Sequence, residues 1–126
     1  MEAQTVTDSG EERIRSWLMA AADWGNEGLT WDHITAGIAD GAYHLLANDD
    51  AAILLEPYQQ ADGRLNVCVL LAGGKLEGVE RLLAEAETIA RDSGAFKLTV
   101  IGREGWRSLA KKIGYRTEAV HYSKDL

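Results

Sequence analysis

The sequence has only one cysteine, one proline and one phenylalanine among its 126 residues, and fewer basic than acidic side chains. The lone cysteine, Cys68, excludes a disulfide within the chain and fits a reducing compartment. Lysine and arginine number 13 against 20 aspartates and glutamates, which gives a formal net charge of −7 at pH 7. Because a protein neutralises nucleic-acid phosphates with basic side chains, this balance argues against general nucleic-acid binding.

Long apolar runs are also missing. No stretch approaches the roughly 20 apolar residues of a membrane-spanning helix, so we expect no membrane partner. Residues 1–4 are acidic and polar and do not resemble a signal peptide. The length suits one domain with its own core, and no linker or repeat interrupts it. We therefore expect a soluble, intracellular single domain over residues 1–126, with residues 1–8 flexible.

Hydrophobic periodicity predicts the elements of the first half of the chain. Helical spacing of apolar side chains predicts two helices, one from about Ser9 to Gly25 and one between Thr30 and Gly41. Apolar runs then predict three strands, the third apolar on both faces as in a covered sheet, over residues 43–47, 52–55 and 65–72. Pro57 cannot donate to a strand ladder, so the second strand ends there or lies at an edge.

The second half alternates helices and strands. A single apolar stripe predicts a long helix over residues 75–92, entered through the turn Gly73-Gly74. A short strand over 97–101, a helix from Trp106 to Gly114 and a last strand over 116–122 follow. A strand that feeds a helix through a glycine turn is the usual geometry for holding an anion on backbone N–H groups.

This element order, together with Gly114-Tyr115 after an amphipathic helix, resembles the GNAT superfamily of acyl-CoA-dependent N-acetyltransferases. The resemblance covers nearly the whole chain. It implies an α/β (α+β) fold, with a central mixed, mostly antiparallel sheet of about five strands and helices on both faces. It also implies that the strand at 65–72 splays from the strand at 97–101. The acyl thioester would enter that gap, and the pyrophosphate would lie on the N-terminus of the following helix.

The resemblance also indicates which residues would hold acetyl-CoA, the cofactor implied if the protein is catalytic. The family's loop reads Arg/Gln-x-x-Gly-x-Gly/Ala, and the matching residues here run from Lys75 through Gly78 and Val79 to Glu80. Glu80 departs from the pattern, because it brings a negative charge where a small residue is required. The alternative register uses Gly73 and Gly74, and it puts Leu76 in a glycine position.

The catalytic positions depart from the family as well. Counting back from Gly114, the position of the family's tyrosine acid is Ala110, which has no proton to give. The family's Asn and Ala upstream of that tyrosine would fall on Arg103 and Trp106. Glu56, near the end of a strand, is the candidate general base, with an exposed strand-end carboxylate as the alternative. Tyr115 and Tyr122 could supply the missing proton, with packing roles as the alternative. Cys68 is predicted to be a buried structural residue. The histidines at 33, 44 and 121 lack metal-ligand spacing.

Two sets of residues are candidates for binding other proteins. Arg103, Arg107 and Lys111 recur every four residues and predict a basic stripe on the last helix, with a solvated helix face as the alternative. Trp24 and Trp31 flank a glycine-containing connection, and indole side chains are common at protein interfaces.

Three functional hypotheses follow. The segment 102–106, the closing Gly-Tyr and the final Ser-Lys-Asp-Leu are similar to small GNAT-like proteins encoded among tailed-phage structural genes. The first hypothesis is accordingly a catalytically degenerate GNAT-fold protein that acts through contacts with other proteins, among them possible virion components. It would be located in the cytoplasm of a bacterium or infected host cell, or in the virion. The second is an acetyl-CoA-dependent N-acetyltransferase. The third is a plain regulatory binding module.

Overall fold

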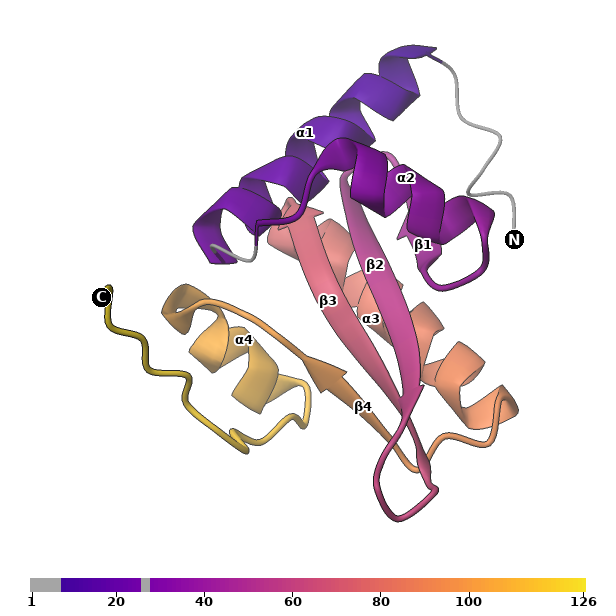
Figure 1. Ribbon diagram of the computed structural model, residues 1–126, viewed down its shortest axis with the longest axis vertical. Coiled ribbons are helices and arrows are strands. Elements are labelled where there is room, and N and C mark those ends of the chain that lie inside the picture. Colours follow the sequence, from indigo (N-terminus) through magenta and orange to yellow (C-terminus); the bar gives the residue numbers. More distant parts are fainter. Residues whose placement is uncertain (1–7, 26–27) are drawn as a thin grey trace.

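The structure is a computed structural model that describes residues 8–25 and 28–126 (Figure 1). Helices and strands occur in the order α1 (Asp8–Gly25), α2 (Trp31–Ala39), β1 (His44–Ala47), β2 (Ala51–Gln59), β3 (Leu65–Gly74), α3 (Leu76–Asp92), β4 (Lys97–Val100), the 3-10 helix η1 (Glu104–Trp106) and α4 (Arg107–Lys112). None of the described helices is both long and apolar enough to cross a membrane.

The strands form one mixed sheet in the order β1-β2-β3-β4. β1 with β2 and β2 with β3 pair antiparallel, whereas β3 and β4 run parallel. The predicted mixed, mostly antiparallel α/β fold is therefore confirmed. β2 does not end at Pro57 but continues to Gln59. Since β1 reaches only as far as the partner of Leu55, Pro57 lies where β2 has β3 alone as a neighbour, so its missing donor is tolerated.

The predicted fifth strand is wrong, because the described part of the sheet has four strands. Residues 116–122 have no regular secondary structure, and no main-chain hydrogen bond of the described residues involves the chain beyond Tyr115, whose N–H donates to Ala110 O at 2.8 Å. The alternating pattern there reports a preference for extended backbone. A strand also needs a neighbour to complete its ladder, and β4 does not provide one.

Helices cover both faces of the sheet, as predicted. In Figure 1, α3 lies behind β2 and β3, while α1 and α2 lie in front of them. Successive residues of β2 point to opposite faces, so Ile53 packs in the core under α3 and Leu54 packs in the core under α1 and α2. Neither side chain has any exposed surface. The middle of the sheet is thus buried on both faces.

Candidate functional site

A gap opens between β3 and β4, as the resemblance implied. The two strands pair only from Asn66 with Lys97 to Val69 with Val100, and the last bond joins Ile101 N–H to Val69 O at 3.1 Å. Beyond that point β3 continues to Gly74, while the chain after Ile101 turns away toward η1. In Figure 1 the two strands diverge toward the end at which α3 begins.

A β-bulge lies where the gap starts. The register of β2 with β3 shifts so that Leu54 faces Leu71 and Leu55 faces Val69, which leaves Leu70 without an opposite residue. β4 has ended its pairing by Leu70 as well. Bulges often occur next to active sites, where they interrupt pairing and redirect a strand. The sequence held no signal for this bulge, because Leu70 stands in an uninterrupted apolar run.

The N-terminus of α3 faces the same end of the sheet and carries charges of both signs. Its N-cap, Lys75, makes no side-chain cap hydrogen bond, and a helix leaves its first N–H groups without helical acceptors. Asp50, in the turn between β1 and β2, approaches this terminus. Its carbonyl oxygen accepts the Lys75 N–H at 2.8 Å, and its carboxylate lies 3.7 Å from Lys75 Nζ and 2.8 Å from an Arg81 guanidinium nitrogen. Both cations near the helix start are therefore paired with one carboxylate.

The role of Asp50 at this helix start cannot be read from the sequence. Asp50 stands in an ordinary Asn-Asp-Asp turn, far from Lys75 along the chain, and nothing in local spacing links the two. Only the antiparallel pairing of β2 with β3, which places Ala51 opposite Gly74, brings this turn to the start of α3.

The three glycines of the predicted phosphate loop each have a packing role. A Cβ atom on Gly73 would collide with the main-chain carbonyl of Trp17 in α1, and one on Gly74 would collide with Asp50 O. Gly74 also has a φ of 112°, which disfavours any side chain. A Cβ on Gly78 would lie 2.7 Å from Asp50 Cβ. Each of these glycines makes room for a neighbouring segment of the protein, so its presence does not in itself indicate a ligand.

The remaining positions of the predicted loop are partly in use. Val79 is fully buried in the core under α3, and its N–H donates to Lys75 O at 3.0 Å within the helix. It therefore offers neither its side chain nor its amide to a phosphate. Glu80 is half-buried one residue further along, and Glu77 is exposed in the first turn. The loop stays a predicted site whose surroundings are acidic.

Glu56 lies on the face of the sheet that α1 and α2 partly cover. It is half-buried, and its strand partner is Cys68 on β3. Burial raises the pKa of the Cys68 thiol, and the Glu56 carboxylate raises it further, so the thiol keeps its proton at neutral pH. Cys68 is thus buried, as predicted. The described residues hold no group of three or more His, Cys, Asp or Glu side chains suited to a metal ion.

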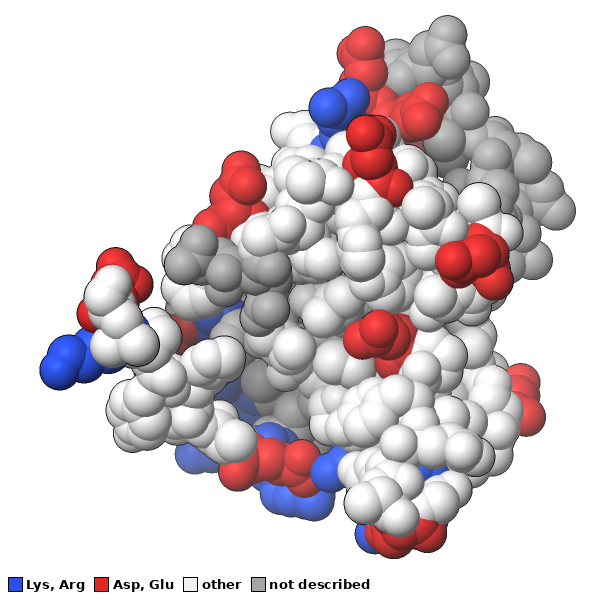
Figure 2. All heavy atoms as spheres, in the orientation of Figure 1, with Lys and Arg blue, Asp and Glu red and all other residues white. Residues whose placement is uncertain are grey.

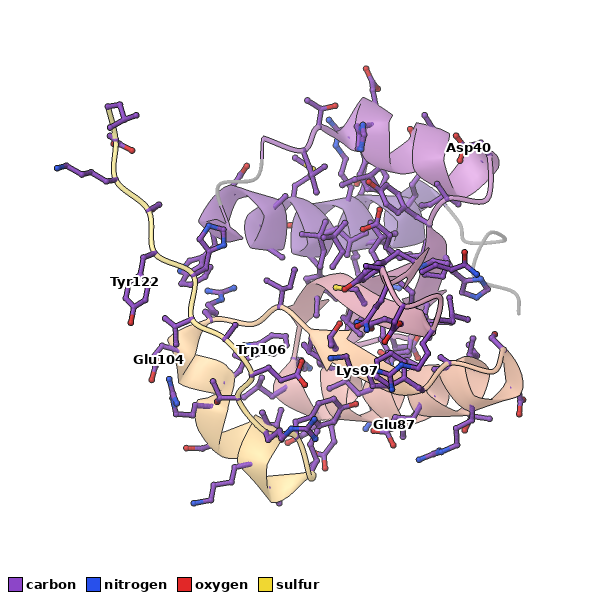
Figure 3. The ribbon with its side chains drawn as sticks, turned by 60° about the horizontal axis from the view of Figure 1, so that its bottom comes forward. Asp40, Glu87, Lys97, Glu104, Trp106 and Tyr122 are labelled. Atoms are coloured by element: carbon purple, nitrogen blue, oxygen red, sulfur yellow. The ribbon has the colours of Figure 1, made fainter. Side chains whose placement is uncertain are left out.

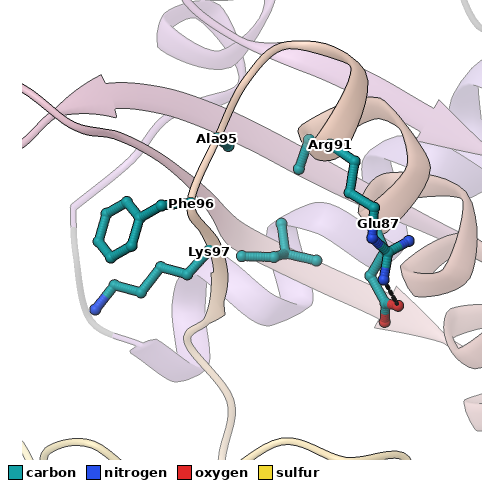
Figure 4. Close-up of a pocket in the computed structure, with 7 residues that line it drawn as sticks. Glu87, Arg91, Ala95, Phe96 and Lys97 are labelled. Atoms are coloured by element: carbon teal, nitrogen blue, oxygen red, sulfur yellow. Dashed lines mark ion pairs between the residues drawn. The ribbon is translucent and has the colours of Figure 1, made fainter.

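The two tyrosines predicted as substitute acids have different surroundings. The Tyr115 hydroxyl donates to a Glu87 carboxylate oxygen on α3 at 2.8 Å, and burial followed by this bond raises its pKa. Tyr122 is 88% exposed and lies away from the sheet (Figure 3). Glu87 also lines a shallow hollow with Arg91 and Phe96 (Figure 4), beside the first residues of β4 and hence at the opposite end of β4 from the gap.

The stability of the protein should fall as the pH rises above about 8.5. The pKa values of Cys68, Tyr43 and Tyr115 are all raised, each chiefly by burial. Their ordinary values are about 8.5 for a thiol and about 10 for a tyrosine. Between the ordinary and the raised value the unfolded chain has lost a proton that the folded chain keeps, so stability decreases with pH. Thermal unfolding measured from pH 7 to 11 tests this.

Tyr115→Phe provides the control for that experiment. The variant should make the loss of stability above about pH 10 less steep, because Tyr43 alone then contributes there, and should leave the loss between about pH 8.5 and 10 unchanged. At pH 7 it should cost about 1 kcal/mol through the lost bond to Glu87. A wild-type melting temperature that holds steady up to pH 11 would contradict the assignment of these three groups.

The predicted partner-binding residues are only partly brought together. The Arg103 guanidinium lies 5.5 Å from the Trp24 ring centroid, so the end of α1 meets the chain after β4. Trp31 instead contacts Arg15, at 5.7 Å. The predicted stripe from Arg103 through Arg107 to Lys111 is not one helix face, because Arg103 is extended (φ −81°, ψ 165°) and α4 begins only at Arg107. Around α4 acidic and basic side chains intermingle (Figure 2), and Arg107 pairs with Glu104 at 2.7 Å.

Comparison with known proteins extends the resemblance to solved structures. No protein-family profile and no curated protein matches the sequence. A probable acetyltransferase superposes with a TM-score of 0.68 at 13% identity, covering 96% of this chain and 95% of that one. An acetyltransferase from Trypanosoma brucei gives 0.61 at 16% identity, with 91% and 94% coverage. A transcriptional regulator from Bacillus halodurans gives 0.67 at 10% identity, with 96% of both chains covered.

Identities this low establish a shared fold and leave the activity open, and one of these three similar structures is described as a regulator. The matches span nearly the whole of both chains, so the architecture is shared as a unit. With four strands in its described part, a gap between β3 and β4 and helices on both faces of the sheet, this chain has the GNAT fold of these acetyltransferases.

Proposed function

We propose that the protein is a catalytically degenerate member of this fold that works through contacts with other proteins. The observation that carries the proposal is the acidic setting of the α3 N-terminus, where Asp50 already pairs with Lys75 and Arg81. The virion or host-cell setting of small tailed-phage proteins, which the segment 102–106 suggested, is part of the proposal.

A CoA pyrophosphate would meet competition at this helix start. Helix N–H groups and the macrodipole favour an anion, but Asp50, Glu77 and Glu80 already supply three carboxylates near the first turn. Both nearby cations are paired with Asp50, so a phosphate would compete with that carboxylate for them. A like charge a few ångströms away costs on the order of 1 kcal/mol or more in a partly screened site. We therefore expect this site to bind a CoA pyrophosphate weakly.

The groups that would donate a proton in catalysis are also absent or already hydrogen-bonded. Ala110 has no acidic hydrogen, and the Tyr115 hydroxyl is held by Glu87. The loss of one general acid typically costs an enzyme about 10²–10⁴-fold in rate. Trp24, by contrast, is 58% exposed with the Arg103 guanidinium over it, and tryptophan and arginine are both enriched in protein interfaces. These features support contacts with proteins better than catalysis.

The alternative function is an acetyl-CoA-dependent N-acetyltransferase, and the gap with the bulge at Leu70 favours it. A substrate amine would attack the thioester carbon directly, the carbon–sulfur bond would break, and the amine would lose a proton to Glu56. The departing thiolate would take a proton from water, since the chain offers no acid at Ala110. Lys75 and Gly78 would hold the pyrophosphate.

Titration calorimetry with acetyl-CoA separates the two functions. We expect no binding tighter than a Kd of about 1 mM for the natural sequence. The double variant Asp50→Asn/Glu80→Gly should bind at least about tenfold more tightly, because two like charges are removed from the helix start. Asp50→Asn/Glu85→Gly is the matched control, since Glu85 is exposed on α3 beyond its first turn.

Each outcome of the titration is informative. Micromolar binding of acetyl-CoA by the natural protein would overturn the degenerate assignment. If the double variant gains nothing over its control, the matching of residues 75–80 to the cofactor loop is wrong. Quantitative mass spectrometry of purified virions tests the phage setting, which predicts a fixed copy number per particle.

A further inference from the structure

The outer edge of β4 is open. β4 is the last strand of the sheet, and no described segment pairs with its outer side. Exposed apolar side chains flank it, Phe96 just before the strand and Ile101, 54% exposed, just after it. Proteins usually protect such an edge with charges, prolines, bulges or a covering segment, because an open edge attracts another strand. Lys97 is the only charged residue within β4.

The same chain carries a segment suited to fill that edge. Residues 116–126, the C-terminal segment, contain neither proline nor glycine, and no main-chain hydrogen bond ties them to the described structure. Val120 is 58% exposed, and with Tyr122 it falls on one side of a period-two pattern. The segment thus has the composition of a strand without a strand partner.

Within one copy the C-terminal segment approaches β4 but does not pair with it. The Lys97 ammonium lies 2.9 Å from a Glu118 carboxylate oxygen, so the charges of the edge and the segment match. After this contact the segment runs clear of β4 in two views (Figures 1 and 3). In Figure 2 the surface is hollowed between the side of the molecule with α4 and this segment and the side with the sheet.

We propose that the open edge of β4 is an interface with a second copy of this chain, whose C-terminal segment pairs with β4 as an added strand. The exchange is reciprocal, so two copies related by a two-fold axis fill both edges and pair both segments. Lys97 of each copy then meets Glu118 of the other. A foreign strand would cover the edge and leave the C-terminal segments unpaired. The segment of the same copy touches β4 through Lys97 and Glu118 and then runs clear of it (Figures 1 and 3), so a second copy is the occupant that fits. The proposal concerns assembly and stands independently of whether CoA binds.

The mass of the full chain in solution is the first test. Light scattering coupled to size exclusion should give twice the mass of one chain at about 100 μM and a shift toward single chains on dilution. Hydrogen exchange should show the amides of residues 116–122, and those β4 amides that face away from β3, protected at high concentration and exposed after dilution. A single-chain mass at every concentration would overturn the proposal.

A charge-exchange experiment identifies the contact between copies. Lys97→Glu alone and Glu118→Lys alone each place like charges together twice per dimer, and each should weaken the dimer by about tenfold. Mixing these two variants restores two opposite-charge pairs in the mixed dimer, so the dimer should return on mixing. If the pair matters only within one copy, or the copies meet elsewhere, mixing restores nothing and the proposal fails. Circular dichroism of each variant shows whether the fold is retained.

Discussion

Replacing Gly73 with alanine is expected to lower the free energy of unfolding by about 3 kcal/mol or more, a large share of the 5–15 kcal/mol of a typical domain. The added Cβ would collide with the main-chain carbonyl of Trp17, and a helix backbone cannot swing aside as the end of a long side chain can. To make room, α1 must lift from β3 and expose Leu18, which is fully buried at present. Gly73 thus sets how closely α1 approaches the sheet.

Two other glycines provide matched controls in the same urea-unfolding experiment. Gly105→Ala should be neutral within about 0.5 kcal/mol, because its Cβ would meet nothing within 4 Å. Gly94→Ala also meets open space, but its φ of 82° should cost about 1 kcal/mol. If Gly73→Ala proved as mild as Gly105→Ala, α1 would not sit on β3 as described.

Truncation of either neighbouring core residue of β2 should be the other severe change. Ile53→Ala and Leu54→Ala should each cost about 2–5 kcal/mol, the range for emptying a well-packed site. The two side chains point to opposite faces and are fully buried, one under α3 and one under α1 and α2. A sheet covered on one face only would show one large effect and one small effect.

Denaturant unfolding of the two variants checks this expectation, with Gln59→Ala as the control. Gln59 belongs to the same strand but is exposed, so its truncation should change the free energy of unfolding by no more than about 0.5 kcal/mol. Equal, large losses at positions 53 and 54 would show that both layers of helices are needed. A small effect at Leu54 would place α1 and α2 away from the sheet.

Most elements were predictable because their signals are local. An apolar stripe at helical spacing indicated a helix over residues 75–92, and α3 spans Leu76–Asp92. The run of apolar residues on both faces of 65–72 likewise predicted a covered strand, and β3 has helices on both sides. Such patterns arise because burial of one face depends on side chains only a few residues apart.

Elements that depend on a distant neighbour were the ones mispredicted. Residues 116–122 alternate like a strand, but pairing requires an adjacent edge in the right place, and the described structure leaves that segment unpaired. The prediction of one basic stripe along the last helix is wrong for a related reason. A spacing of four residues implies one face only if the helix is continuous, and the extended Arg103 interrupts it.

The candidate site shows the same division. Local spacing in the sequence was enough to place Lys75 and Gly78 at a helix start after a strand, where anions are attracted. Three features of the site depend on contacts between segments remote in the chain: Asp50 pairs with the two nearby cations, Leu70 bulges at the gap, and Gly73 lies against the backbone of α1. Helix and strand preferences follow from neighbouring residues, whereas the charge and shape of a site follow from which distant segments the packed core brings together.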